Sequence, residues 1–251
     1  MSNSKLYDFA WFQNFDEKIE ELKTLAMPEN WDYNNGDNRK NKILINYIHH
    51  TFAKLDSENK IECYSDNCTF NTGLVTLNQE EIHGYFSKNK KPNTTIPWYF
   101  VGWKKSSDRV LSQFSKLGEL ANYFHDPSEL IYDPKIELRV NIDHIIQDNI
   151  ARFPRPIASM DNHLISNILS GTIEDAKRRV RRNYKTAIPQ YFNGKLQLLL
   201  PLCLQKKSEA DLALVIEKYN GTYRASTCLT LEMAINNARL IAKPDDEWLK
   251  L

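Results

Sequence analysis

The last third of the chain decides the fold class. Residues 184–229 read YKTAIPQYFNGKLQLLLPLCLQKKSEADLALVIEKYNGTYRASTCL. Asn193-Gly194 and Asn220-Gly221 each separate two runs rich in apolar residues, and Asn-Gly in that setting is the strongest short signal of a β-hairpin. The strands that this pattern predicts are 184–192, 195–200, 211–218 and 222–229. Their apolar residues leave little polar face, so we expect this antiparallel sheet to be covered on both sides.

Helical periodicity is common upstream of these hairpins. Apolar residues at spacings of three and four predict helices, which fall at 15–26, 40–57, 107–117, 142–153 and 161–182. Capping patterns predict two more helices, over 78–86 and 230–241. Short strands are predicted at 61–64, 68–71, 96–103 and 136–140, the first two as a hairpin. This order predicts an α+β fold: a helical N-terminal part, a mixed middle, and a mainly antiparallel C-terminal sheet of hairpins covered by helices.

Length and composition limit the classes of protein. The 251 residues predict a single α+β domain, residues 1–251, with two closely packed lobes, 1–125 and 126–251, as the alternative. A hydrophobic share of 41% and a charged share of 26% are typical of a globular chain. The net charge is +1, so any affinity for nucleic acid has to be local. Eight glycines and no glycine-rich phosphate loop argue against dinucleotide or P-loop cofactors, and we expect no cofactor.

The compartment is predicted from the start of the chain and from its cysteines. The N-terminus lacks the charged and apolar regions of a signal peptide, and no apolar run approaches the roughly 20 residues of a membrane span. Four cysteines are few for a secreted scaffold, which favours a soluble protein in the reducing cytoplasm. Cys63 and Cys68 lie five residues apart without histidines at ligand spacing, so we expect structural or incidental thiols rather than a metal site.

Two polar segments in the first two thirds could bind a ligand. Asn71 and Thr72 precede Gly73 in a predicted turn, where they could face a ligand oxygen or simply end the strand. Arg139 and Asn141 precede a predicted helix that begins near His144. A helix N-terminus beside an arginine can hold an anion, and a histidine in the first turn can transfer a proton. The alternative is a helix cap with a surface histidine. Arg152 lies further along the same helix.

Two further segments follow the long helix predicted at 161–182. Five of the six residues 177–182 are basic, and Arg178 and Arg182 share one helix face with Arg181. Such a cluster suits phosphate contacts, or it is a solvated face that is paired within the protein. Lys185 and Gln190 lie on a predicted strand with an internal proline, so that strand is at an edge or bulged. Its polar residues either line a pocket or protect the edge.

Five stretches of the sequence resemble one family along essentially the whole chain. They are Tyr7–Phe12, Phe70–Leu74, Arg139–His144, Asn183–Tyr191 and Tyr223–Thr227. The chain is similar to a bacterial family catalogued as domain of unknown function 3825. This resemblance implies no reaction. Members of that family sometimes adjoin cold-shock or other RNA-binding modules, so the resemblance favours RNA or nucleotides as ligands.

The sequence therefore leads to three hypotheses. The first is an RNA- or nucleotide-directed protein whose pocket includes Asn71, Thr72, Arg139, Asn141, His144, Arg152, Lys185, Gln190 and Arg224. As an enzyme it would carry out metal-independent phosphoryl or nucleotidyl transfer or cleave phosphodiesters, with His144 and Lys185 as catalytic residues and the arginines on phosphate oxygens. The second is a non-catalytic RNA-binding module that uses the basic residues 177–182, including Arg178 and Arg182. The third is a protein-interaction domain.

Overall fold

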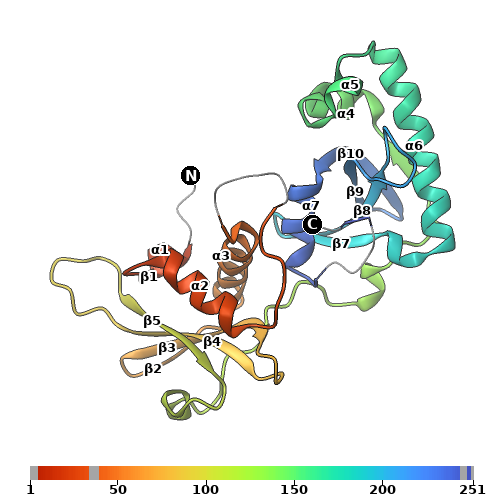
Figure 1. Ribbon diagram of the computed structural model, residues 1–251. Helices are drawn as coiled ribbons and strands as arrows, with labels where there is room; N and C mark the ends of the chain where they lie inside the picture. Colours follow the sequence, from red (N-terminus) through yellow and green to blue (C-terminus); the bar gives the residue numbers. More distant parts are fainter. Residues whose placement is uncertain (1–4, 34–39, 244–247, 250–251) are drawn as a thin grey trace. The chain divides into compact units, whose positions relative to one another are not determined.

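The chain forms two compact units, Met1–Asn122 (unit 1) and Tyr123–Leu251 (unit 2). The computed structural model describes residues 5–33, 40–243 and 248–249. Each unit contains one five-stranded sheet with helices packed on it (Figure 1). The fold is α+β, as the sequence predicts.

Unit 1 has its helices first and its sheet second. The elements are α1 (Lys5–Phe9), β1 (Ala10–Trp11), α2 (Phe15–Leu25), α3 (Lys42–Ser57), β2 (Glu62–Tyr64), β3 (Asn67–Val75), β4 (Glu81–Lys88), β5 (Trp98–Lys105) and a short 3-10 helix, η1 (Arg109–Gln113). The sheet order is β1-β5-β4-β3-β2, with β1 parallel to β5 and the other pairs antiparallel. The predicted helix at 40–57 is confirmed, and its apolar stripe from Ile43 to Leu55 is buried.

An aromatic cluster forms the core between α3 and the sheet. Phe52 of α3 lies edge-on to Phe70 of β3 at 5.2 Å between ring centroids, and Phe70 stacks on Phe86 of β4 at 5.7 Å. All three rings are fully buried. Gly84 pairs with Phe70 across the strands, and a Cβ atom built on it would lie 2.1 Å from the Phe70 ring. The glycine therefore gives the ring its space.

Two sequence predictions about secondary structure in unit 1 are wrong. Residues 78–86 were predicted as a capped helix, but residues 81–88 form strand β4. Burial on both faces of the sheet explains this: residues 82–86 are all buried, and while Phe86 packs on Phe52 of α3, Tyr85 packs on Leu111 and Phe114. The helix predicted over 107–117 is reduced to the single turn η1.

A disulfide joins two cysteines that the sequence analysis treats as thiols. Cys63 of β2 and Cys68 of β3 stand opposite each other in the hairpin and are bonded, with their Cα atoms 4.1 Å apart. The tight turn at 65–66 produces this approach, which sequence spacing alone does not reveal. The interpretation of these two residues as thiols is therefore wrong, and the expected reducing compartment loses that support. Cys203 and Cys228 are free thiols.

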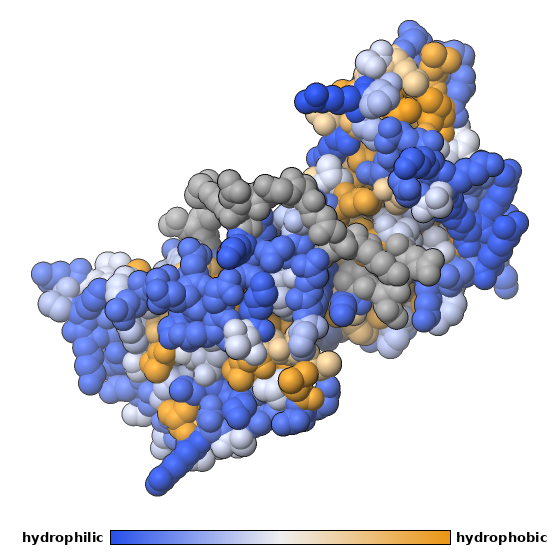
Figure 2. Space-filling model, viewed as in Figure 1, coloured by the Kyte–Doolittle hydropathy of each residue, from blue (hydrophilic) through white to orange (hydrophobic). Residues whose placement is uncertain are grey.

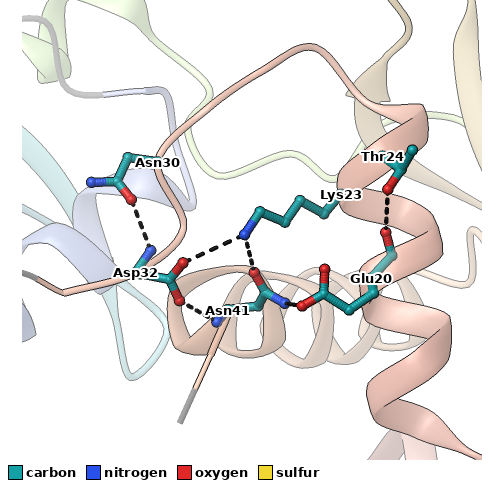
Figure 3. Close-up of polar contacts among 6 residues, drawn as sticks. All are labelled: Glu20, Lys23, Thr24, Asn30, Asp32 and Asn41. Atoms are coloured by element: carbon teal, nitrogen blue, oxygen red, sulfur yellow. Dashed lines mark hydrogen bonds and ion pairs between the residues drawn. The ribbon is translucent and has the colours of Figure 1, made fainter. Parts of the chain in front are cut away.

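A polar network joins α2 to the start of α3 (Figure 3). Asn41 is buried and adopts a left-handed backbone, with φ of 57°. Its side chain donates to Glu20 at 2.6 Å and accepts from Lys23 at 2.8 Å, while its backbone N–H donates to Asp32. Asn30 accepts a bond from the backbone of Asp32. Asn41 thus connects α2, the segment around Asp32 and α3.

A histidine in unit 1 makes its stability depend on pH. The His49 ring stacks on Phe15 at 5.2 Å, and burial, followed by the neighbouring His50, lowers the pKa of His49 to about 4. Unfolded histidine titrates near 6.5, so between pH 6.5 and 4 the unfolded chain takes up a proton that the folded unit excludes. The stability is complete above pH 6.5 and falls as the pH drops through this window. We expect a loss of about 1–2 kcal/mol at pH 5, allowing for the partial exposure of the ring.

The measurement is thermal unfolding between pH 7.5 and 4.5, a range that covers most of the ~6.5-to-4 window. His49→Phe should make the profile less steep without flattening it, because burial also lowers the pKa values of His50 and His83, whereas His163→Gln, at an exposed position of unit 2, should leave it unchanged. A His49→Phe profile as steep as that of the wild type would contradict the role of His49.

Unit 2 is a sheet of hairpins between helices. Its elements are η2 (Pro127–Leu130), β6 (Leu138–Val140), α4 (Ile142–Asn149), η3 (Ile150–Arg152), α5 (Arg155–Ala158), α6 (Asn162–Arg182), η4 (Tyr184–Thr186), β7 (Ile188–Phe192), β8 (Lys195–Leu202), β9 (Leu212–Tyr219), β10 (Thr222–Thr230) and α7 (Leu231–Arg239). The sheet order is β6-β10-β9-β8-β7, antiparallel except that β6 runs parallel to β10. Both predicted Asn-Gly hairpins are confirmed.

Alternation along the strands gives the sheet of unit 2 two apolar faces. Leu198, Leu200, Leu214 and Ile216 pack with the buried stripe of α6 in one core. Residues of the opposite parity, such as Leu199 and Val215, are also buried, and α7 contacts β7, β9 and β10. The sheet is therefore covered on both sides, as predicted. One difference is that residues 184–186, predicted as strand, form the 3-10 turn η4.

The hydropathy of the helices bears on the membrane prediction. Within the described part of the chain, no helix combines the length and the apolar character needed to cross a membrane.

Candidate functional site

The predicted site residues lie on several different elements of the two units. Asn71 and Thr72 lie on β3 of unit 1, with both side chains buried. Asn71 donates to the Gly118 carbonyl at 3.3 Å and accepts from Gly73 N at 2.9 Å, while the Thr72 hydroxyl donates to the Ile82 carbonyl at 2.6 Å. These bonds hold the irregular pairing of β3 with β4 between Asn71 and Val75. Asn71 and Thr72 thus have a structural role in β3, and their contact with a ligand stays a prediction.

The start of α4 agrees with the alternative interpretation of the sequence, a helix cap with a surface histidine. Asn141 is the N-cap of α4, and its side chain accepts from His144 N at 3.1 Å. His144 is exposed and lies 3.4 Å from the carboxylate of Asp148, one turn later. Arg139 pairs with Glu137 at 2.8 Å on the exposed side of β6. Cap and surface pairs account for the contacts of these residues.

Arg152 supports a bulge in the sheet. It donates to the Thr227 hydroxyl at 3.3 Å and to the Cys228 carbonyl at 2.5 Å. The neighbouring Asn149, which is buried, accepts from the same hydroxyl and from Cys228 N. The pairing of β10 with β9 shifts at this point, between Arg224 and Thr227. Arg152 therefore binds groups of the bulge, and its role as a phosphate ligand stays a prediction.

Three predicted residues share one row across the sheet of unit 2. Arg139 pairs with Arg224, Arg224 with Glu217, and Gln190 with Gln197. Gln190 is buried, donates to Gln197 at 2.9 Å and accepts from Asn237 of α7 at 3.1 Å. The Arg224 guanidinium lies 4.7 Å from the centre of the Tyr219 ring. Gln190 and Arg224 of this row are thus engaged in contacts within the protein.

The two predicted catalytic residues lie at different edges of this sheet. His144 follows β6 and Lys185 precedes β7, and these are the first and last strands in the sheet order. Four inter-strand spacings of about 4.8 Å separate these edges by roughly 19 Å. A pair of residues that shares one proton-transfer site needs hydrogen-bond reach, so the arrangement does not bring His144 and Lys185 to one reacting group.

The C-terminal end of α6 carries the cations that the sequence singled out. Lys177 pairs with Glu174 at 2.6 Å and Arg178 with Asp175 at 3.2 Å, so these two charges are matched on the helix itself. Arg179 and Arg182 form no ion pair with any residue that the structure describes. The hydrophilic surface over this half of α6 is seen on the right of Figure 2.

A cleft of about 460 Å³ opens at this end of the helix, and we call it the α6-end cleft. Its walls come from α6, η4, β8, the β8–β9 loop and the C-terminal segment. The lining residues are Arg179, Arg182, Asn183, Thr186, Pro201, Lys207, Ser208 and Trp248. Three of them are cations, and none of the described lining residues is acidic. The cleft is therefore a positively charged hollow with hydroxyl and amide groups beside one indole ring.

Short contacts fix the walls of the α6-end cleft. Arg179 donates to the Cys203 sulfur at 3.3 Å and to the backbone carbonyl of Lys207, which ties the β8–β9 loop to α6. Burial raises the pKa of the Cys203 thiol, and Arg179 opposes that shift only in part. Cys203 is thus a thiol at neutral pH and does not itself neutralise the guanidinium, although Asp211 and Asp175 lie close enough to act on the same thiol. The Trp248 indole donates to the Thr186 carbonyl at 2.9 Å, which holds the ring against η4.

Sequence analysis found only part of this site. Arg182 belongs to the predicted basic run, and Thr186 lies in a stretch that the family resemblance singled out. Lys207, Ser208 and Trp248 were not proposed, because they lie far from α6 in the sequence and only the folded chain brings them there. Lys206-Lys207 in the loop after β8 was a local signal, since it adds two cations beside the strand that packs on α6.

Comparison with known proteins gives a family but no function. Among the described residues, no group of three or more histidines, cysteines or acidic residues could hold a metal ion. No curated protein and no solved structure significantly matches the chain. One family model does match, over residues 22–248, and this is most of both units. The chain therefore belongs to the family described as domain of unknown function DUF3825.

Proposed function

We propose that unit 2 binds RNA or a nucleotide through its phosphate groups in the α6-end cleft. The observation that supports this is the set of three cations, Arg179, Arg182 and Lys207, around one hollow without a described acidic wall. The protein as a whole is nearly neutral, with a net charge of +1, so this is a local excess. A local positive hollow attracts and retains an anionic ligand without a positive field over the whole molecule.

The types of residue favour a phosphate with an aromatic group nearby. A guanidinium presents several N–H donors in a plane and matches two oxygens of a phosphate, and a lysine adds a compact charge. Asn183, Thr186 and Ser208 supply uncharged groups at the same walls. Trp248 offers a ring on which a base can stack, and base stacking on aromatic side chains is common in single-strand recognition.

Binding suits this site better than catalysis. The described residues that line the α6-end cleft include no histidine and no carboxylate that could act as a general base at neutral pH. Lys185 lies in the turn beside the cleft but does not line it, and His144 belongs to the opposite edge of the sheet. The proposal is therefore a binding module.

Arg182→Ala is expected to weaken the binding of a short single-stranded RNA about tenfold at low salt. Each lost phosphate contact also lowers the slope of log K against log salt by about 0.7–1. Arg182 suits this test better than Arg179, because Arg179 also holds the β8–β9 loop. The measurement is fluorescence anisotropy of a labelled RNA over a series of salt concentrations.

Arg178→Ala is the matched control, since it removes the same charge from the same helix outside the α6-end cleft. It should change affinity much less than Arg182→Ala. Equal losses in both variants would mean that the RNA senses only the general charge of α6. If the wild type fails to bind RNA, nucleotides or inorganic phosphate even at low salt, the proposed function is wrong.

A further inference from the structure

A second hollow of unit 2 lies on the other side of η4. It has a volume of about 300 Å³, and we call it the η4 pocket. Its floor is apolar: Ala187, Ile188 and Ala238 line it and are almost fully buried. Ile131 and Tyr184 also line it but are exposed, at 49% and 60%. A concave apolar floor with accessible apolar walls is the usual form of a site for a small planar or aliphatic group.

Two lysines stand at this pocket. Lys185 and Lys243 both line it and are exposed, and neither forms an ion pair with a residue of the described ranges. No described acidic residue lines the pocket. The pocket thus combines an apolar interior with positive charge at its walls, and such a site favours a ligand that has an apolar ring or chain and an attached anionic group.

The η4 turn is the wall that this pocket shares with the α6-end cleft. Asn183 and Thr186 line the cleft, whereas Tyr184, Lys185 and Ala187 line the pocket. The turn is held from both ends, because the Asn183 side chain accepts from Lys185 N at 3.1 Å and the Thr186 carbonyl accepts from Trp248. Consecutive residues of one rigid turn therefore face two hollows, one for phosphate and one for an apolar ring.

We infer that the η4 pocket receives a base of a single-stranded RNA whose phosphates lie in the α6-end cleft. This inference rests on the proposed function and deepens it, because it adds base recognition to phosphate binding. The base enters against Ile188 and Ala238 and stacks on Tyr184, and Lys185 and Lys243 contact the adjoining phosphates. Along a single strand of nucleic acid, each base with its apolar faces is followed by a negatively charged phosphate. The apolar η4 pocket and the cationic α6-end cleft, on either side of η4, match this alternation.

The two hollows together indicate the class of ligand. A double helix keeps its bases stacked inside, so only a single strand can place one in a pocket. A free phosphate would use the cleft and leave the apolar walls of the pocket, Ile131 and Tyr184, exposed to water. The walls include Tyr184 at 60% exposure and Ile131 at 49%, so a ring that packs against them removes apolar surface from water.

Ala242→Phe tests the inference by filling the pocket. Ala242 lines the pocket, is exposed and lies beyond the end of α7, so a larger side chain can enter the hollow without crowding the core. Ala151→Phe is the control, with the same substitution at an exposed position of η3 that does not line the pocket. The probes are a labelled single-stranded RNA and an abasic ribose–phosphate strand of the same length, measured by anisotropy with the full chain.

The wild type should bind the RNA about tenfold more tightly than the abasic strand, as expected for one stacked base. Ala242→Phe should abolish this difference and leave abasic binding unchanged, and Ala151→Phe should preserve it. Arg182→Ala should weaken both strands. Equal binding of both strands by the wild type, or an unaltered preference in Ala242→Phe, overturns the base pocket while the phosphate site stands. If neither strand binds, the proposed function fails together with this inference.

Discussion

Replacing Gly84 with alanine is expected to destabilise unit 1 by about 3 kcal/mol, near the upper end of what overpacking of a core usually costs. The added Cβ would lie 2.1 Å from Cε1 of Phe70 and 2.8 Å from two further atoms of that ring. The ring cannot move aside easily, because it is fully buried between Phe52 and Phe86. Either the ring leaves its position or strands β3 and β4 separate, and both disrupt the aromatic core.

Urea unfolding followed by tryptophan fluorescence measures this effect. Trp11, Trp31, Trp98 and Trp103 lie in unit 1, so the signal reports mainly on that unit. Gly171→Ala is the control, because a Cβ there meets no atom within 4 Å and the position lies on α6 of unit 2, so the unfolding of unit 1 should be unchanged. Phe70→Leu combined with Gly84→Ala should cost less than the sum of the single changes. Strict additivity would show that the clash with Phe70 is not the cause.

The parts of the fold that the sequence predicts are those with a strong local period or turn. The stripe from Ile43 to Leu55 can be buried only by a helix, and the two Asn-Gly pairs leave little choice but hairpins. Residues 78–86 have a helical cap pattern, yet they form β4 because the sheet offers partners on both sides. Strand pairing in the folded unit therefore outweighed the helical propensity of this segment, as is common for short segments.

The functional site was less predictable for a different reason. Polar residues can be selected from a sequence by residue type, but the contacts of each one in the folded chain determine its role. Asn71 and Arg152 bind backbone groups of irregular strands, and Arg178 is matched by Asp175 one turn earlier. Arg182 keeps its charge available because no described carboxylate reaches it. A sequence gives the inventory of charges, whereas only the fold shows which ones are already neutralised.

Asn41→Ala is expected to destabilise unit 1 by about 3 kcal/mol, through two separate effects. The change removes the amide that donates to Glu20 and accepts from Lys23, two part-buried hydrogen bonds to charged groups that together contribute about 2 kcal/mol. It also places alanine in a left-handed backbone, with φ of 57°, which costs about 1 kcal/mol more. Figure 3 shows that these bonds converge on Asn41 from two other parts of the unit.

Asn41→Gly separates the two effects, because glycine accepts the left-handed backbone but lacks the amide. Its loss of stability in urea unfolding should be about 1 kcal/mol smaller than that of Asn41→Ala. Lys23→Met should show less than additive coupling with Asn41→Gly, since both remove the same hydrogen bond. If the glycine variant is as stable as the wild type, the backbone alone explains the effect. The network would then hold the start of α3 without stabilising the unit, since only the strain at Asn41 would count in the free energy of unfolding.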